Sequence, residues 1–178
     1  MILIGIGANL PSERYGTPVQ TCEAALTALG EAPGVRVTRR SRWFESAPVP
    51  ISDQPWYVNG ACVVETDLAP HDLLQVLHDL EAEFGRVRDQ KNAARVLDLD
   101  LLAYDDFIST TNDHMDVPHP RLDGRAFVLL PLQDLVPGWI HPQSGASLHT
   151  LIEALPADQI ARPMERRPEP DEDDFGED

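Results

Sequence analysis

Residues 96–104, VLDLDLLAY, alternate apolar and acidic side chains, and this pattern constrains the fold of the chain more than any other feature. Successive side chains of a β-strand point to opposite faces, so the leucines share one face while Asp98 and Asp100 share the other. Such a strand packs its apolar face against a core. The segment therefore predicts a strand in a sheet whose other face carries two carboxylates.

Two segments before this strand have the spacing of amphipathic helices. Residues 18–29 follow a capping-box sequence that begins at Thr17, and Gly30 provides a stop. Residues 70–84 begin with a proline, place apolar residues three and four apart, and are followed by Gly85. We expect a helix in each segment.

Further strands and helices are expected along the rest of the chain. Residues 46–55 hold three prolines and are typical of an irregular loop. Interleaved helices and strands, with strands next to each other in sequence, favour an α+β sandwich over a doubly wound sheet. Strands are expected at residues 2–10, 35–45 and 56–65, a short helix or strand at 126–135, and a last short helix at 148–155.

The charge balance limits the partners that the chain can have. Thirty acidic and 14 basic residues give a net charge of −16, which repels nucleic acids and anionic membranes. We therefore expect no nucleic-acid or membrane partner, and any site for an anionic ligand has to be a local cluster of arginines.

The sequence also predicts one domain in a reducing compartment. No signal peptide or membrane span is evident, and Cys22 and Cys62 lie in apolar stretches, as small core residues do. This favours a cytoplasmic protein. Residues 1–156 are expected to form one domain, and the polar, proline-rich and acidic residues 157–178 a disordered tail.

Asp98 and Asp100 are candidate metal ligands. In a strand their Cα atoms lie roughly 6.6 Å apart, a spacing at which two carboxylates repel each other unless they are solvated or share a cation. Mg²⁺ is commonly held by one or two carboxylates together with substrate phosphates. The alternative is an amphipathic strand with an acidic face in solvent.

Cations precede and follow this pair in the sequence. Arg86, Arg88, Lys91 and Arg95 lie just before it, and residues 117–127 bring a histidine and two arginines after it. Metal-binding carboxylates with nearby arginines suit phosphate chemistry on a nucleotide. The alternative for each segment is a charged loop in water. No glycine-rich phosphate loop and no zinc-ligand spacing is present in the sequence.

Taken together, five segments resemble the 6-hydroxymethyl-7,8-dihydropterin pyrophosphokinase family. They are IGIGANL (4–10), SAPVPISDQPWYVNGACVVET (46–66), LEAEFGRVR (80–88), ARVLDLDLL (94–102) and VPHPRLDGRAFVLLPL (117–132). The resemblance implies pyrophosphate transfer from ATP to the pterin alcohol in folate biosynthesis, with AMP as the second product. It also implies two Mg²⁺ ions, a monomer, and a ferredoxin-like α+β fold whose antiparallel sheet is sandwiched by helices in three α/β/α layers.

The resemblance assigns roles residue by residue. Asp98 and Asp100 correspond to the metal ligands, and with Arg86 and Arg95 they form the expected catalytic set. ATP binding falls to Glu81, Arg88, His119 and Arg125, and pterin binding to Ser46, Ala47, Pro48, Tyr57, Asn59 and Phe127. A flat heteroaromatic ring suits an aromatic sandwich made by Phe127 with an aromatic residue at 56–57, and its amide edge suits Asn59.

The sequence departs from the family pattern at two places. Residues 91–94, Lys-Asn-Ala-Ala, lack an arginine and a tryptophan that the family commonly carries before the position of Arg95, and Pro120 replaces a common tyrosine. Two other functions are compatible with the residues. One is a non-catalytic ferredoxin-like binding module. The other is a metal-dependent phosphodiesterase that uses Asp98 and Asp100 and needs no pterin.

Overall fold

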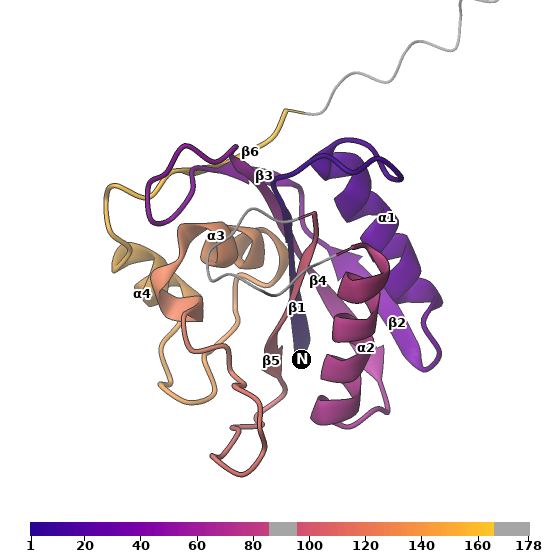
Figure 1. Cartoon of the computed structure of the whole chain (residues 1–178). Helices are drawn as coiled ribbons and strands as arrows, with labels where there is room; N and C mark the ends of the chain where they lie inside the picture. Colours follow the sequence, from indigo (N-terminus) through magenta and orange to yellow (C-terminus); the bar gives the residue numbers. More distant parts are fainter. Residues whose placement is uncertain (86–95, 166–178) are drawn as a thin grey trace, which may run out of the picture.

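The structure, a computed structural model, describes residues 1–85 and 96–165, and the strands within them form one antiparallel sheet (Figure 1). β1 (Ile2–Ala8) lies between β4 (Tyr57–Thr66) and β5 (Asp98–Tyr104). The other strands are β2 (Val35–Arg40), β3 (Phe44–Ser46) and β6 (Ala161–Pro163). The order across the sheet is β5-β1-β4-β3-β6, and β2 also pairs with β4.

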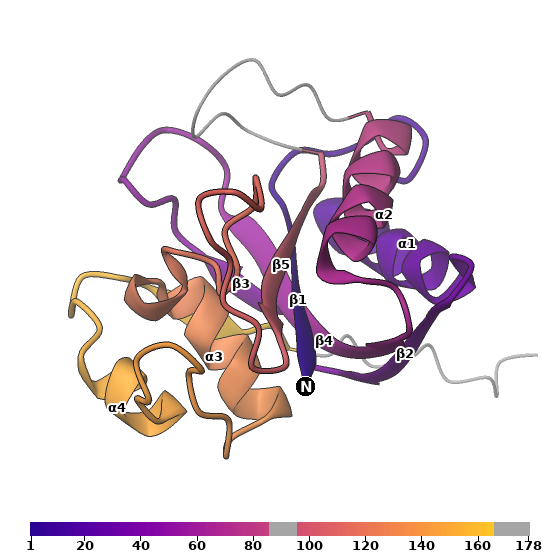
Figure 2. The ribbon, with the colours of Figure 1, turned by 90° about the horizontal axis from the view of Figure 1, so that it is seen from below.

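Helices cover both faces of this sheet (Figures 1 and 2). α1 (Pro18–Glu31) and α2 (Pro70–Glu83) lie on one face, and α3 (Ala126–Leu135) and α4 (Leu148–Glu153) lie on the other. A short 3₁₀ turn, η1 (Leu122–Gly124), precedes α3. The arrangement confirms the expected α+β fold, a sheet between two layers of helices.

Alternation along β1 gives the molecule two cores. Ile2, Ile4 and Ile6 belong to the core formed with α1 and α2, whereas Leu3 packs with the leucines of α3 and α4. Cys22 and Cys62 are fully buried in the first core, and this burial raises the pKa of each thiol to about 12. Both are therefore apolar core residues, as expected. Among the described residues, no helix has the length and apolar character needed to span a membrane.

Local signals in the sequence set the helix boundaries. The backbone N–H of Gln20 donates to Thr17 Oγ1 at 3.3 Å, and the Thr17 N–H donates to Gln20 Oε1 at 2.9 Å, which completes the predicted capping box of α1. The ambiguous segment 126–135 is helix α3, with Pro131 inside it.

The strand expected over residues 35–45 is divided in two. β2 ends at Arg40 and β3 begins at Phe44, and both pair with β4. At the break, the Ser41 Oγ accepts the Ala61 N–H at 2.9 Å, and the ring of Trp43 packs over Gly60. Residues 35–45 contain no proline or glycine that would have predicted this interruption.

The chain also stays ordered beyond the boundary expected at residue 156. β6 pairs with β3, and the Met164 N–H donates to the Trp43 carbonyl at 2.9 Å. These contacts involve the backbone, and so the polar composition of residues 157–165 did not indicate them. Residues 166–178 of the expected tail lie outside the described residues.

We predict that Gly60→Ala destabilises the protein. A Cβ at this position would lie 2.5 Å from Trp43 Cζ3, and the ring is held because its Nε1 donates to Glu23 at 2.7 Å. Overpacking of this kind costs about 1–3 kcal/mol, which calorimetry would record as a lower Tm. In the control, Gly30→Ala in the last turn of α1, the new Cβ lies 3.8 Å from a Val37 methyl group, an ordinary van der Waals contact, so the Tm should not fall. Equal Tm values for the two variants would contradict the packing argument.

Candidate active site

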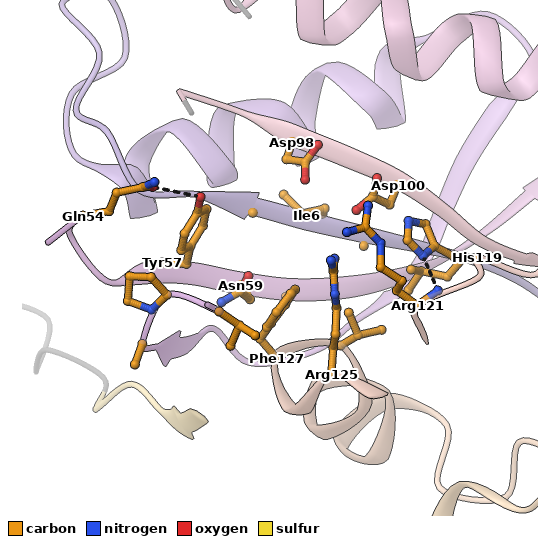
Figure 3. Close-up of a pocket in the computed structure, with 18 of the residues that line it drawn as sticks. Ile6, Gln54, Tyr57, Asn59, Asp98, Asp100, His119, Arg121, Arg125 and Phe127 are labelled. Carbon is orange, nitrogen blue, oxygen red and sulfur yellow. Dashed lines mark hydrogen bonds between the residues drawn. The ribbon is translucent and has the colours of Figure 1, made fainter. Parts of the chain in front are cut away.

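A cavity of about 400 Å³ lies over the sheet between the loop after β3 and the start of α3 (Figure 3). This volume is in the range of small-molecule sites, roughly 300–1,000 Å³. Its lining comes from β1, β4 and β5, from residues 47–54, and from the segment that leads into α3. The lining residues assigned from the sequence are Ala47, Pro48, Tyr57, Asn59, Asp98, Asp100, His119, Arg125 and Phe127.

The two predicted metal ligands lie on the cavity face of β5. Asp98 is in register with Gly7 of β1, and Asp100 is in register with Gly5. Both glycines line the cavity, so no side chain of β1 stands beside the carboxylates at these positions. The alternation that placed both aspartates on one face is therefore confirmed.

The two carboxylates suit an Mg²⁺ ion whose other ligands come from water and from the phosphates of a bound substrate. Within residues 1–85 and 96–165, no group of three or more His, Cys, Asp or Glu side chains is placed to hold a metal ion. Asp98 and Asp100 line the cavity as a pair of hard oxygen donors. Mg²⁺ commonly takes one or two carboxylates and fills its octahedral shell with water and substrate phosphates.

Asn59 lies on the far side of β1 from these carboxylates. In the sheet, Gly7 is in register with Asp98 on one side and with Asn59 on the other. Two strand spacings separate Asp98 from Asn59, roughly 10 Å between backbones. A Cβ on Gly7 would approach Asn59 Oδ1 to 3.2 Å, so glycine leaves room for the amide group there.

The Asn59 side chain is held in one orientation by a neighbouring strand. It is 5% exposed, and its Nδ2 donates to Ser46 Oγ of β3 at 2.6 Å. Ser46 does not line the cavity among the described residues and contacts the site through this bond. Tyr57 and Phe127 also line the cavity (Figure 3). Ala47 and Pro48 belong to the same lining.

His119 enters the cavity from the loop after β5. Its backbone N–H donates to the Leu102 carbonyl at 2.9 Å, which ties the loop to the strand. Burial and the positive charges of Arg125 and Arg121 lower the pKa of His119. Because Nδ1 accepts the Arg121 N–H at 3.2 Å, the neutral ring carries its proton on Nε2. The histidine can thus donate a hydrogen bond without adding charge.

Two arginines bring positive charge to the same cavity. Arg125 Cζ lies 5.3 Å from the centre of the Phe127 ring, and Arg121 extends toward Asp100 (Figure 3). Arg125 was assigned to ATP from the resemblance, whereas Arg121 had no predicted role. The only signal for Arg121 was its place in the segment 117–127, two residues after His119.

Several predicted site residues stay untested by this geometry. Glu81 of α2 is 1% exposed and is not one of the described residues that line the cavity, so its contact with a nucleotide remains a prediction. Trp56 is 41% exposed and is also not among them. Arg86, Arg88 and Arg95 lie outside the described residues, as does Lys91. Gln54 lines the cavity and was not anticipated.

Comparison with known proteins points to one family. Residues 3–137 match the family model of 7,8-dihydro-6-hydroxymethylpterin-pyrophosphokinase. A 2-amino-4-hydroxy-6-hydroxymethyldihydropteridine pyrophosphokinase of Pseudomonas aeruginosa is 38% identical over 161 residues, which cover 90% of this chain and 95% of that protein. The protein of the same name from Synechocystis sp. is 36% identical over 153 residues, covering 86% and 75%.

Solved structures support the fold. The wild-type HPPK-DHPS of Plasmodium falciparum matches with a TM-score of 0.63 at 12% identity, over 85% of this chain and 44% of that one. This chain therefore spans less than half of that longer protein. The family model covers more than half of the chain, and the bacterial relatives match over most of their length. The chain belongs to the 7,8-dihydro-6-hydroxymethylpterin-pyrophosphokinase family.

Proposed function

We propose that the cavity holds the phosphates of ATP beside Asp98 and Asp100 and the pterin beside Asn59 and Phe127. The protein is a pyrophosphokinase of folate synthesis, which transfers pyrophosphate to 6-hydroxymethyl-7,8-dihydropterin. The observation that carries the proposed arrangement is the register Asp98–Gly7–Asn59 across three strands. Because of this register, two carboxylates and a planar amide group lie at opposite sides of one cavity, which supports the proposal.

In the proposed reaction the pterin hydroxyl oxygen attacks the β-phosphorus of ATP. The bond between that phosphorus and the oxygen bridging to the α-phosphorus breaks, AMP leaves with the bridging oxygen, and the hydroxyl proton is released. Phosphoryl-transfer reactions of this kind depend on positioning and charge stabilisation rather than on a covalent enzyme intermediate. No general base is assigned.

Bound Mg²⁺ would neutralise charge on the phosphate oxygens. Asp98 and Asp100 would hold it, and we propose two ions, as the resemblance implies. Arg121 and Arg125 suit non-bridging phosphate oxygens because a guanidinium presents several donors in a fixed fork. The neutral His119 would donate from Nε2 to an oxygen of the nucleotide.

The pterin would be fixed by shape and by its polar edge. Asn59 presents an amide whose Nδ2 already donates to Ser46, which leaves the second Nδ2 proton and Oδ1 for a ligand. Phe127 and Tyr57 offer aromatic surfaces to a flat ring. We further propose a monomeric, cytoplasmic enzyme whose catalytic domain is followed by an acidic tail.

Product analysis tests the proposed function. ATP, Mg²⁺ and 6-hydroxymethyl-7,8-dihydropterin are incubated with the protein, and nucleotides are separated by chromatography. We expect AMP to appear together with the pterin diphosphate, and only when the pterin and Mg²⁺ are both present. AMP formed without the pterin would favour a phosphodiesterase. Binding of ATP or the pterin without any AMP formation would favour a binding module.

A further inference from the structure

The segment 159–164 connects two walls of the cavity, although it lies beyond residues 3–137 that match the family model. On one side, β6 pairs with β3, and the Ile160 carbonyl accepts the backbone N–H of Ala47 at 3.1 Å. Ala47 lines the cavity directly after β3. The segment thus holds the loop that we assign to the pterin.

On the other side, Gln159 caps the start of α3. Its Oε1 accepts the Ala126 N–H at 2.8 Å, and its Nε2 donates to the Gly124 carbonyl at 2.7 Å. The first N–H groups of a helix lack partners within that helix, and the N-cap residue Arg125 supplies no side-chain hydrogen bond here. A side chain 33 positions away in sequence therefore completes the helix start.

The two backbone groups that Gln159 holds are the neighbours of Arg125. Arg125 and Phe127 both line the cavity, and the Arg125 guanidinium lies 5.3 Å from the Phe127 ring. Both side chains extend from the start of α3 toward the strands (Figure 3). A change in the backbone at residues 124–126 would therefore move both of them.

We propose that Gln159 is a positioning residue, which fixes the start of α3 relative to the loop at Ala47 and so sets the width of the pterin end of the cavity. Its role is indirect, because its two hydrogen bonds go to backbone groups and not to a ligand. The proposal rests on the proposed pterin site for its effect on binding. Its structural part, the cap on α3, does not.

Gln159→Met tests the proposal, because methionine has a similar length and apolar stem but makes neither hydrogen bond. The matched control is Gln133→Met, which makes the same substitution at an exposed glutamine within α3. Titration calorimetry with 6-hydroxymethylpterin is expected to give a Kd about 10-fold higher for Gln159→Met and an unchanged Kd for the control. We also expect the KM for the pterin to rise more than kcat falls.

Hydrogen–deuterium exchange separates this proposal from the proposed function. In Gln159→Met we expect faster exchange in the peptide that contains residues 124–129, whereas the control exchanges like the unmodified protein. Unchanged exchange there, or unchanged Kd and KM with only a lower Tm, would overturn the positioning role. Failure of the unmodified protein to bind the pterin would count against the proposed site, while the exchange result would still judge the cap.

Discussion

Asparagine in place of Asp98 or Asp100 is expected to lower kcat at least ~100-fold, or ~2.7 kcal/mol in activation free energy, while the protein stays folded. Each substitution keeps the size of the side chain and removes the negative charge that would hold Mg²⁺. The folded state should not suffer, because both residues line the cavity rather than the core.

Asp106→Asn is the matched control, since this exposed carboxylate lies just after β5 and does not line the cavity among the described residues. Steady-state kinetics at saturating ATP and Mg²⁺ would compare the three variants, and calorimetry would confirm folding. A normal kcat in either cavity variant would remove that aspartate from the proposed metal site.

Arg95→Ala is expected to lower kcat about 100-fold or more, whereas Lys91→Ala should cost less than about 10-fold. Both residues lie outside the described part of the chain, and the expected difference follows from their positions in the sequence and from their chemistry. Arg95 precedes Asp98 by three residues in the sequence, whereas Lys91 precedes it by seven. Lysine is also a point charge that cannot form the two-pronged contact of arginine with a phosphate.

Kinetics on the two single variants would decide this prediction, with KM for ATP measured alongside kcat. An equal loss in Lys91→Ala and Arg95→Ala would assign Lys91 the role of the arginine that residues 91–94 lack. That outcome would contradict our ranking of the two cations but would leave the cavity residues unaffected.

The periodicity of apolar residues and the helix-capping sequence predicted the central part of the fold. The alternation in 96–104 gave both the strand and the shared face of its aspartates, because side chains of a strand have a strict period of two. The capping box at Thr17 located α1, because it depends only on neighbouring residues. These features are local, and local sequence determines them.

The remaining features depend on contacts between distant residues. The break between β2 and β3 accompanies the packing of Trp43 over Gly60, and β6 forms through backbone pairing with β3. Neither contact leaves a periodic signal in the chain. Gln159 likewise lies in the polar segment that was predicted to be a disordered tail, although its side chain caps the helix that begins at Ala126.

The site was predicted partly from the residues and partly from the resemblance. The pairing of Asp98 with Asp100 followed from strand geometry, whereas the roles of Asn59, Ser46 and Phe127 came from the family. Arg121 was missed because an arginine in a loop carries no periodic signal, and its entry into the cavity depends on the fold of residues 117–125.

A crystal structure with Mn²⁺, 6-hydroxymethylpterin and α,β-methylene-ATP would test the central claim most directly. The methylene group replaces the oxygen whose bond to the β-phosphorus would break, so the ternary complex cannot react. We predict anomalous scattering from Mn²⁺ in contact with both Asp98 and Asp100, and the pterin between Tyr57 and Phe127 beside Asn59. Manganese that touches neither aspartate, or a pterin bound outside this cavity, would contradict the account.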